Sequence, residues 1–290
     1  MEMLTYRIIQ CTIVGLMMGS VYALIALGFN LIHGVVRVIN FSHGMFVLVG
    51  MYLSMVVYEA LGLDPYLALV FTLPAAFIIG VVLHRLFVHP ILNAPRINQL
   101  ILTLGLMIFM ENCLLIIFGG RTRGLGLWYT SKSILLGNIS INYSLLFASI
   151  CTLLSMVGLI FFLRHTRLGK SMRAVADERE AAGLLGTNVW NVYAIAFGLA
   201  AVLAAIAGAA TVSYWIVIPS DGRPIVIKAF IVAVFGGAGS IGGTILGGVI
   251  LGLLENYALL VVNPSLSSAI SLAVMIAVIL ARPSGLLGKA

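Results

Sequence analysis

Long apolar stretches constrain this chain more than any other feature of its sequence. Seven of them, most about 20 residues long, lie at 8–29, 45–58, 66–86, 98–118, 143–163, 189–217 and 267–280. A stretch of that length crosses the hydrocarbon core of a bilayer as one helix, and lipid offers no hydrogen-bond partners to any other backbone. An eighth region, 225–262, is apolar but interrupted by glycines. The sequence therefore predicts an all-α polytopic membrane protein with about eight spans and a glycine-broken or re-entrant segment.

The amino-acid composition supports this prediction and limits the kinds of partner that are expected. Hydrophobic residues make up 62% and charged residues 9%, against about 45–50% and about 25% in soluble domains. The net charge of +7 is explained by basic residues in cytoplasmic loops. The sequence has no basic run with interleaved aromatic residues, so nucleic acid is not an expected partner. Membrane lipid is expected to surround the spans. Three scattered cysteines predict neither a disulfide framework nor a zinc site, so no metal or cofactor is expected.

The longest polar segment, RLGKSMRAVADEREAAGLLG at 167–186, holds the densest cluster of Lys and Arg. It is therefore predicted to be cytoplasmic. Counting spans back from it places the 85–96 loop on the same side and the 119–142 loop outside. Arg282 and Lys289 favour a cytoplasmic C-terminus, which requires 225–262 either to form a re-entrant hairpin or to cross twice; the sequence leaves both open.

Two polar or glycine-rich interruptions, VINFSHG at 38–44 and FGGAGSIGG at 235–243, stand between apolar helices. Transporters are often built from two such repeats, so a weak internal two-fold repeat is predicted. Asn40, Ser42 and His43 are candidates to line the transport pathway. The alternative, equally favoured, is a cytoplasmic turn in which Asn40 or Ser42 caps the next helix.

Glycines in the second interruption fit G-x-G-x-x-G, from Gly237 to Gly242. A dinucleotide site needs a soluble parallel sheet around that motif, which this sequence does not predict. Small residues at four-residue spacing instead indicate helices packed closely in lipid. The candidates for pathway or packing roles here are Gly237, Gly239, Ser240 and Gly243, with further spaced pairs at Gly243–Gly247, Gly248–Gly252 and Gly15–Gly19.

Titratable side chains are few. Glu255 and Glu111 lie inside apolar runs; Glu255 is a pathway candidate that either faces a buried partner or reaches the interface, and Glu111 is predicted to reach the interface from near a helix end. The histidines His84, His89 and His165 lie at loop edges and are predicted to be solvated. No catalytic motif is present, so the chain is predicted not to be an enzyme. Gly169-Lys170-Ser171 lacks the earlier glycine of a phosphate loop, so ATP binding is not expected on this chain.

Four stretches carry a resemblance to a known family: 39–52 (INFSHGMFVLVGMY), 169–197, 227–257 and the tail 281–288 (ARPSGLLG). With these motifs the chain resembles the branched-chain amino acid permeases of bacterial ABC importers, the LivH-type subunit. The resemblance implies one transmembrane permease domain over 1–290 in the bacterial inner membrane. It also implies two ABC ATPase subunits, a second permease subunit (the same chain or another) and a periplasmic substrate-binding protein as partners. Many relatives carry Glu after the His-Gly pair, where this chain has Met45.

ABC importers often carry the pattern Glu-Ala-Ala, three residues, then Gly in the segment that contacts the ATPase, and Glu180, Ala181, Ala182 and Gly186 match it. The later Ile-x-Leu-Pro of the fuller motif is missing. The resemblance thus implies an ATPase-coupling loop at about 164–188. We expect a short helix at 180–186, with the two alanines seated in an ATPase groove, Gly186 ending the helix, and Arg173 and Arg179 pairing with acidic partner groups. The alternative is a solvated connector.

The predicted function is the permease subunit of an ATP-driven importer for branched-chain or related hydrophobic amino acids. One alternative keeps this architecture but carries urea, amides or another small solute. A further alternative is a stand-alone ion-coupled carrier, which would need an ion site at Glu255 or Glu111.

Overall fold

The computed structural model describes residues 2–282 and 284–288. Eight of its helical segments are long and apolar enough to cross a membrane, which confirms the prediction of an all-α membrane protein with about eight spans. They begin with α1 (Glu2–Val36), α2 (His43–Leu61), α3 (Pro65–Leu83) with the short turns η1 (His84–Val88) and η2 (His89–Ile91), α4 (Arg96–Phe118) and α5 (Tyr143–His165). The others are α8 (Val189–Thr211), α10 (Ile241–Ala258) and α11 (Pro264–Ala281). Two short strands, β1 (Ser133–Leu136) and β2 (Ile139–Asn142), form an antiparallel hairpin.

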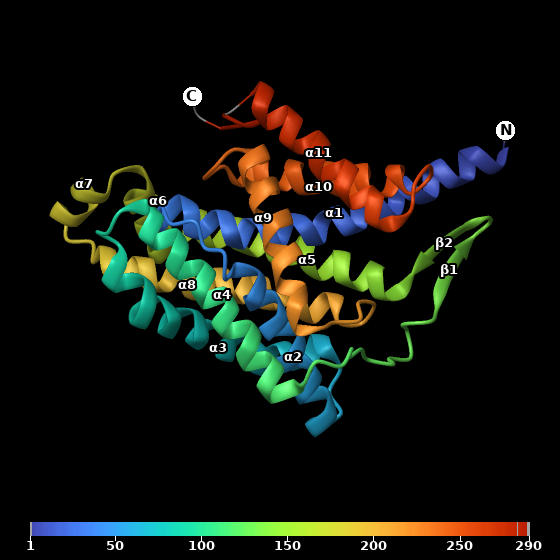
Figure 1. Cartoon of the computed structure of the whole chain (residues 1–290), viewed down its shortest axis with the longest axis horizontal. Helices are drawn as coiled ribbons and strands as arrows, with labels where there is room; N and C mark the ends of the chain where they lie inside the picture. Colours follow the sequence, from blue (N-terminus) through green and yellow to red (C-terminus); the bar gives the residue numbers. More distant parts are fainter. Residues whose placement is uncertain (1, 283, 289–290) are drawn as a thin grey trace.

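The helices run back and forth between two ends of the molecule (Figure 1). Helices α6 (Arg167–Asp177) and α7 (Arg179–Leu184) lie at one end, which we call the α6 end. The β1–β2 hairpin lies at the opposite end, the hairpin end. This placement agrees with the prediction that the 119–142 loop and the 167–186 segment face opposite sides of the membrane.

The start of α1 lies at the hairpin end, where the Gln10 amide donates to the Ser140 carbonyl at 2.5 Å. The end of α1 lies at the α6 end, where the Arg37 guanidinium donates to the Ala176 carbonyl of α6 at 3.2 Å. The segment after α11 lies at this end too, since the Leu286 amide donates to the Phe235 carbonyl at 2.8 Å. Arg282 therefore precedes a segment on the predicted cytoplasmic side, while Lys289 lies outside the described residues.

Helices α1 and α10 pack backbone to backbone. A β-carbon on Gly252 would lie against the backbone of Gly15 and Gly19, and one on Gly248 would lie against that of Ala23. In lipid such close approach supplies the dispersion contacts that hold helices together. The spaced glycines at 248–252 and 15–19 thus pack as the sequence predicts. Gly239 differs, because it lies in the turn before α10 with φ of +81° and not on the helix face.

We expect Gly252→Val to lower the yield of folded protein in detergent and its melting temperature, because inserting methyl groups into a closed helix contact costs about 1–3 kcal/mol. The matched control is Gly158→Val in α5, where an added β-carbon meets nothing within 4 Å. Size-exclusion chromatography measures the yield of folded protein, and thermal melting measures the melting temperature. Equal behaviour of the two variants would show that the α1–α10 contact does not limit stability.

Two helices begin inside the molecule. After the non-helical residues 37–42, α2 starts at His43, whose Nε2 lies 2.9 Å from the carbonyl of Ile25. Ile25 lies 11 residues before the end of α1 at Val36, or about 16 Å along the axis, which is about half the thickness of a bilayer core. Helix α9 (Gly222–Gly236) has 15 residues and is about 22 Å long, too short to cross.

The starts of these two helices meet, because Gly222 packs directly on the backbone of Gly44. From that point α2 runs to the hairpin end and α9 to the α6 end. Region 225–262 is therefore a half-crossing by α9 followed by a full crossing by α10, which ends where the Tyr257 hydroxyl bonds Thr12 at 2.7 Å. The interruption at 235–243 forms the α9–α10 turn, whereas the one at 38–44 leads into the start of α2.

Candidate functional site: the α6–α7 unit and a buried polar cluster

Helices α6 and α7 form a compact unit at the α6 end. The Thr166 hydroxyl caps α6 by accepting from the Gly169 amide at 3.0 Å, and Met172 and Val175 are buried. Helix α7 ends in a Schellman motif: the Gly186 amide donates to the Gly183 carbonyl and the Thr187 amide to the Ala182 carbonyl, both at 3.0 Å. Gly186 has φ of +85°, a conformation that side chains with a β-carbon adopt at a cost. The structure confirms the prediction that Gly186 ends the helix.

The predicted coupling residues do not all face outward. Arg173, Glu180 and Ala181 are exposed. Ala182 is buried within this chain, and the Arg179 guanidinium lies over the rings of Trp190 and Tyr193 of α8, 4.9 and 5.6 Å from their centroids.

Arg179 therefore holds the α6–α7 unit to α8, and Ala182 is enclosed within this chain, contrary to the expectation that both face a partner. The outward apolar side chains are instead Leu184 and Leu185, which are 89% and 87% exposed. Sequence reasoning passed over them, although two leucines beside a polar loop are a detectable signal.

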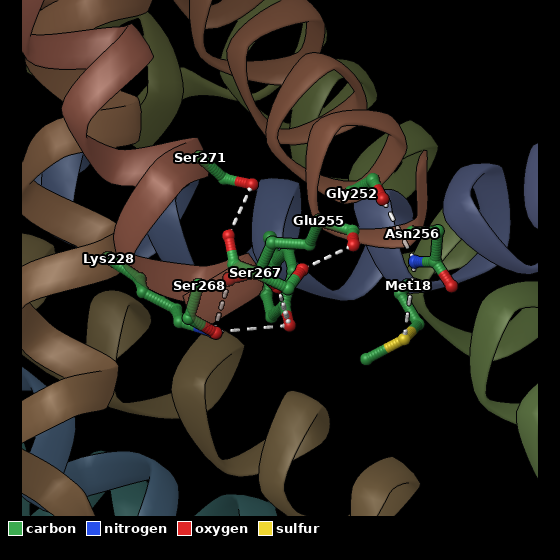
Figure 2. Close-up of polar contacts among 9 residues, drawn as sticks. Met18, Lys228, Gly252, Glu255, Asn256, Ser267, Ser268 and Ser271 are labelled. Carbon is green, nitrogen blue, oxygen red and sulfur yellow. Dashed lines mark hydrogen bonds and ion pairs between the residues drawn. The ribbon is translucent and has the colours of Figure 1, made fainter. Parts of the chain in front are cut away.

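A polar cluster is buried among α1, α9, α10 and α11 (Figure 2). The Lys228 ammonium of α9 lies 2.7 Å from Oε1 of Glu255 in α10, and both side chains are largely buried. The contact is ionic and lies off the hydrogen-bond direction of that oxygen. The Tyr22 hydroxyl of α1 donates to the other carboxylate oxygen at 2.7 Å, and the ammonium also lies 4.9 Å from the Tyr22 ring centroid. Glu255 therefore faces buried partners, the first of its two predicted alternatives.

Serines of α11 complete this cluster. The Ser267 hydroxyl donates to the Glu255 backbone carbonyl at 2.5 Å, and the Lys228 ammonium lies 3.4 Å from the Ser268 hydroxyl. Figure 2 shows these groups converging from three helices on the Lys228–Glu255 pair. The pair is thus the one place among the described residues where a buried cation and a buried carboxylate meet with both side chains under one-fifth exposed.

The candidates of the first interruption are fully buried. The Asn40 carboxamide oxygen accepts from the Ser42 amide at 3.1 Å and from its hydroxyl at 2.6 Å, and α2 has no side-chain cap. His43 packs on Gly28 of α1. These residues brace the start of α2, so they form neither an exposed helix cap nor the wall of an open pore in this conformation.

Candidates near the second interruption serve the α9–α10 turn. Gly237 has φ of +105°, the Ser240 hydroxyl caps α10 by accepting from the Gly243 amide at 3.2 Å, and Gly243 packs on Gly236 of α9. The Asn30 side chain of α1 binds this turn by accepting from the Gly239 amide at 2.7 Å. These contacts tie the end of α9 to α1, and Gly239 and Ser240 also line a cavity of about 620 Å³.

Glu111 does not reach the interface as predicted. It is buried in α4 and accepts two hydrogen bonds from Arg223, from Nε at 2.8 Å and from the terminal amino group at 3.1 Å. The prediction of solvated histidines is also wrong for His84, which is fully buried with its ring centroid 5.0 Å from that of Phe197. Neither Arg223 nor Lys228 was singled out from the sequence, although a lone cation in an apolar stretch is a recognisable signal.

Cavities of about 620, 90 and 20 Å³ lie along the described part of the chain. The large cavity, about 620 Å³, opens near the α6 end between α1, α4, α6 and the α9–α10 turn, and its lining includes His33, Arg37, Arg96, Asp177, Gly239 and Ser240. The small cavity, about 20 Å³, is lined by Tyr22 and Lys228 together with apolar side chains of α1, α2 and α9. Within residues 2–282 and 284–288 no group of three metal-binding side chains is present.

Comparison with known proteins identifies the family. Residues 12–279 match the family model described as branched-chain amino acid transport system, permease component. The chain is 35% identical to the high-affinity branched-chain amino acid transport system permease protein LivH of Salmonella typhimurium, over 95% of this chain and 94% of the relative. It is 33% identical to the corresponding protein BraD of Pseudomonas aeruginosa, over 98% and 97%.

A partial similarity, 29% identity over 56% of this chain and 52% of the relative, extends to the ribose import permease protein RbsC of Escherichia coli. No solved structure matches the chain. The family model covers nearly the whole chain, including the polar unit between α5 and α8. The chain is a multi-pass membrane protein that belongs to the family of permease components of branched-chain amino acid transport systems.

Proposed function

We propose that this chain, acting as a single permease domain over 1–290, forms the pathway by which an ATP-driven importer carries leucine, isoleucine and valine across a bacterial inner membrane. The observation that carries the proposal is the family match over residues 12–279, together with relatives whose names state branched-chain amino acid transport. ATP hydrolysis belongs to two separate ABC ATPase subunits. A second permease subunit and a periplasmic binding protein complete the assembly.

The α6–α7 unit is the proposed contact with the ATPase. It is the densest cluster of charge in the chain, it lies at one end of the helices (Figure 1), and it offers Glu180, Leu184 and Leu185 to a partner. Because Arg179 fastens the unit to α8, a displacement of the ATPase reaches the spans as a rigid-body shift.

The test of this function is reconstitution of the purified subunits with an ATPase pair and a binding protein in proteoliposomes. We expect uptake of labelled leucine to require ATP and to be reduced by excess isoleucine and valine, but not by urea or ribose. Uptake driven by a sodium or proton gradient without the ATPase would instead establish the stand-alone carrier. Competition by urea alone would establish the alternative solute.

Glu180→Lys is expected to release the ATPase from the solubilised complex. A charge reversal at an exposed contact position replaces an attraction with repulsion and weakens the complex at least about tenfold. The matched control is Glu59→Lys, the same change on a 60% exposed side chain at the hairpin end. Co-purification under mild detergent measures the ATPase recovered. Equal recovery with both variants would place the contact elsewhere.

A further inference from the structure

One face of α1 links the large cavity and the small cavity. Tyr22 and Ile25 line the small cavity and His33 lines the large one; spacings of three and four residues keep such positions on one helix face. Phe29 lies between them on that face. Its ring packs at 5.9 Å from Phe230 of α9, and Phe230 in turn packs at 6.2 Å from Phe41, in the segment before α2.

The three phenylalanines Phe29, Phe41 and Phe230 therefore pack together at the face of α1 that lies between the two cavities. Two of them come from α9 and from the non-helical 37–42 segment. A shift of either element relative to α1 would separate these rings.

The wall of the small cavity combines apolar side chains with one cationic side chain. Val21, Ile25, Val47 and Met51 make most of it apolar, and the Lys228 side chain stands among them. A buried ion pair adds little stability compared with apolar residues of the same volume, and ionisable groups within membrane spans generally mark the pathway of a solute or ion. The Lys228–Glu255 pair therefore calls for a role other than holding the helices together.

We propose that the Lys228–Glu255 pair is the subsite for a zwitterionic amino acid, which inserts between the two side chains. The substrate carboxylate binds the Lys228 ammonium and the Tyr22 hydroxyl, and the substrate ammonium binds Glu255. In the empty state each protein group neutralises the other, at 2.7 Å. A zwitterion carries the same two charges, so the exchange leaves no buried charge unpaired. The aliphatic side chain then lies against Val21, Ile25, Val47 and Met51.

This subsite rests on the proposed function and deepens it. The present cavity of about 20 Å³ beside Lys228 holds at most one water molecule, and the Lys228 ammonium lies against Glu255, so the structure has the subsite closed. Opening it requires a displacement of α9, which carries Lys228. The displacement also moves Phe230, two residues further along α9, away from Phe29 and Phe41.

The decisive variant is Lys228→Met with Glu255→Gln, which removes both charges and keeps the volume and an acceptor for Tyr22. We expect the complex to assemble, to melt within a few degrees of the wild type and to keep its basal ATP hydrolysis. ATP-driven leucine uptake should fall by about 10- to 100-fold, which is the loss of affinity expected when a hydrogen bond to a charged group is removed. Ser268→Ala is the matched control, because it removes a contact of Lys228 at 3.4 Å and leaves both charges; its uptake should stay within twofold. Wild-type uptake in the neutral double variant would show that the pair is only structural and would overturn the proposal.

A second measurement does not depend on any variant folding. Binding of labelled leucine to the wild-type complex without binding protein is competed with norleucine, leucinamide and 4-methylpentanoate. Leucinamide lacks the carboxylate, and 4-methylpentanoate lacks the ammonium group. We expect competition by norleucine and at least about tenfold weaker competition by each of the others. Equal competition by all three would overturn the subsite while leaving leucine uptake, and so the proposed function, intact. Absence of ATP-dependent uptake of any branched-chain amino acid by the wild type would overturn both.

Discussion

Replacing Gly186 with valine is expected to abolish ATP-dependent leucine uptake while the chain still accumulates in the membrane. Gly186 ends α7 with φ of +85° and two amide-to-carbonyl bonds that hold the motif closed. A residue with a β-carbon pays about 1–2 kcal/mol in this left-handed conformation, and branching at that carbon raises the cost. Because α7 has only six residues, the loss of its C-cap unwinds the surface that carries Leu184 and Leu185.

The matched control is Gly183→Val. Gly183 lies three positions earlier in α7, has no positive φ and has only a Val189 methyl group, at 3.9 Å, near an added β-carbon. Its uptake should stay within a few-fold of the wild type, whereas Gly186→Val should lose uptake and retain ATP hydrolysis by the free ATPase. If both variants transport equally well, the shape of the α7 terminus does not matter for coupling.

The second large effect is an asymmetry between the two partners of the Glu111–Arg223 pair. The Glu111 side chain is 7% exposed and that of Arg223 is 56% exposed. Arg223→Met leaves a carboxylate buried without a cation, which costs up to about 3–5 kcal/mol in buried pairs. Glu111→Leu leaves an arginine that is more than half exposed on this chain and whose long side chain can extend toward water, so its cost should be smaller.

Thermal melting of the purified chain in detergent tests this asymmetry. We expect the Arg223→Met melting temperature to lie well below that of Glu111→Leu, and the double variant Arg223→Met with Glu111→Leu to recover most of the difference, because no unpaired charge is left. If Arg223 anchored α9 through contacts other than Glu111, the double variant would melt as low as Arg223→Met alone, and the asymmetry would not come from the buried carboxylate.

The spans could be predicted from the sequence because each is an apolar stretch with polar ends. Helix α9 could not. Its fifteen residues continue into the glycine-rich turn and α10 without a charged break, so hydropathy alone gives one long apolar region. The start of α2 deep inside the molecule was left open, because polar residues such as Asn40 and His43 fit an interruption inside the membrane and a solvent-exposed turn equally well.

Features of the site that depend on neighbouring residues in the sequence were predicted correctly. Features that depend on contacts between distant residues were not. The Gly186 stop depends on a few neighbouring residues and was predicted. The partners of Glu255 come from positions 22 and 228, and the partner of Glu111 lies at 223. No spacing rule within one helix connects residues so far apart. Arg179 was expected to face outward for the same reason, since Trp190 reaches it only after the chain turns into α8.

The meeting of α2 and α9 at Gly44 and Gly222 has a consequence for what cannot pass through the protein. Each helix start carries a partial positive charge of about half an elementary unit, and both lie near half depth. Sodium ions and protons that enter the protein between these two helix starts therefore meet a repulsive potential in a region of low dielectric constant. An importer that opens thousands of times on a charged membrane must not dissipate the ion gradients across it, and here the electrostatic barrier to cation leakage is supplied by the backbone itself.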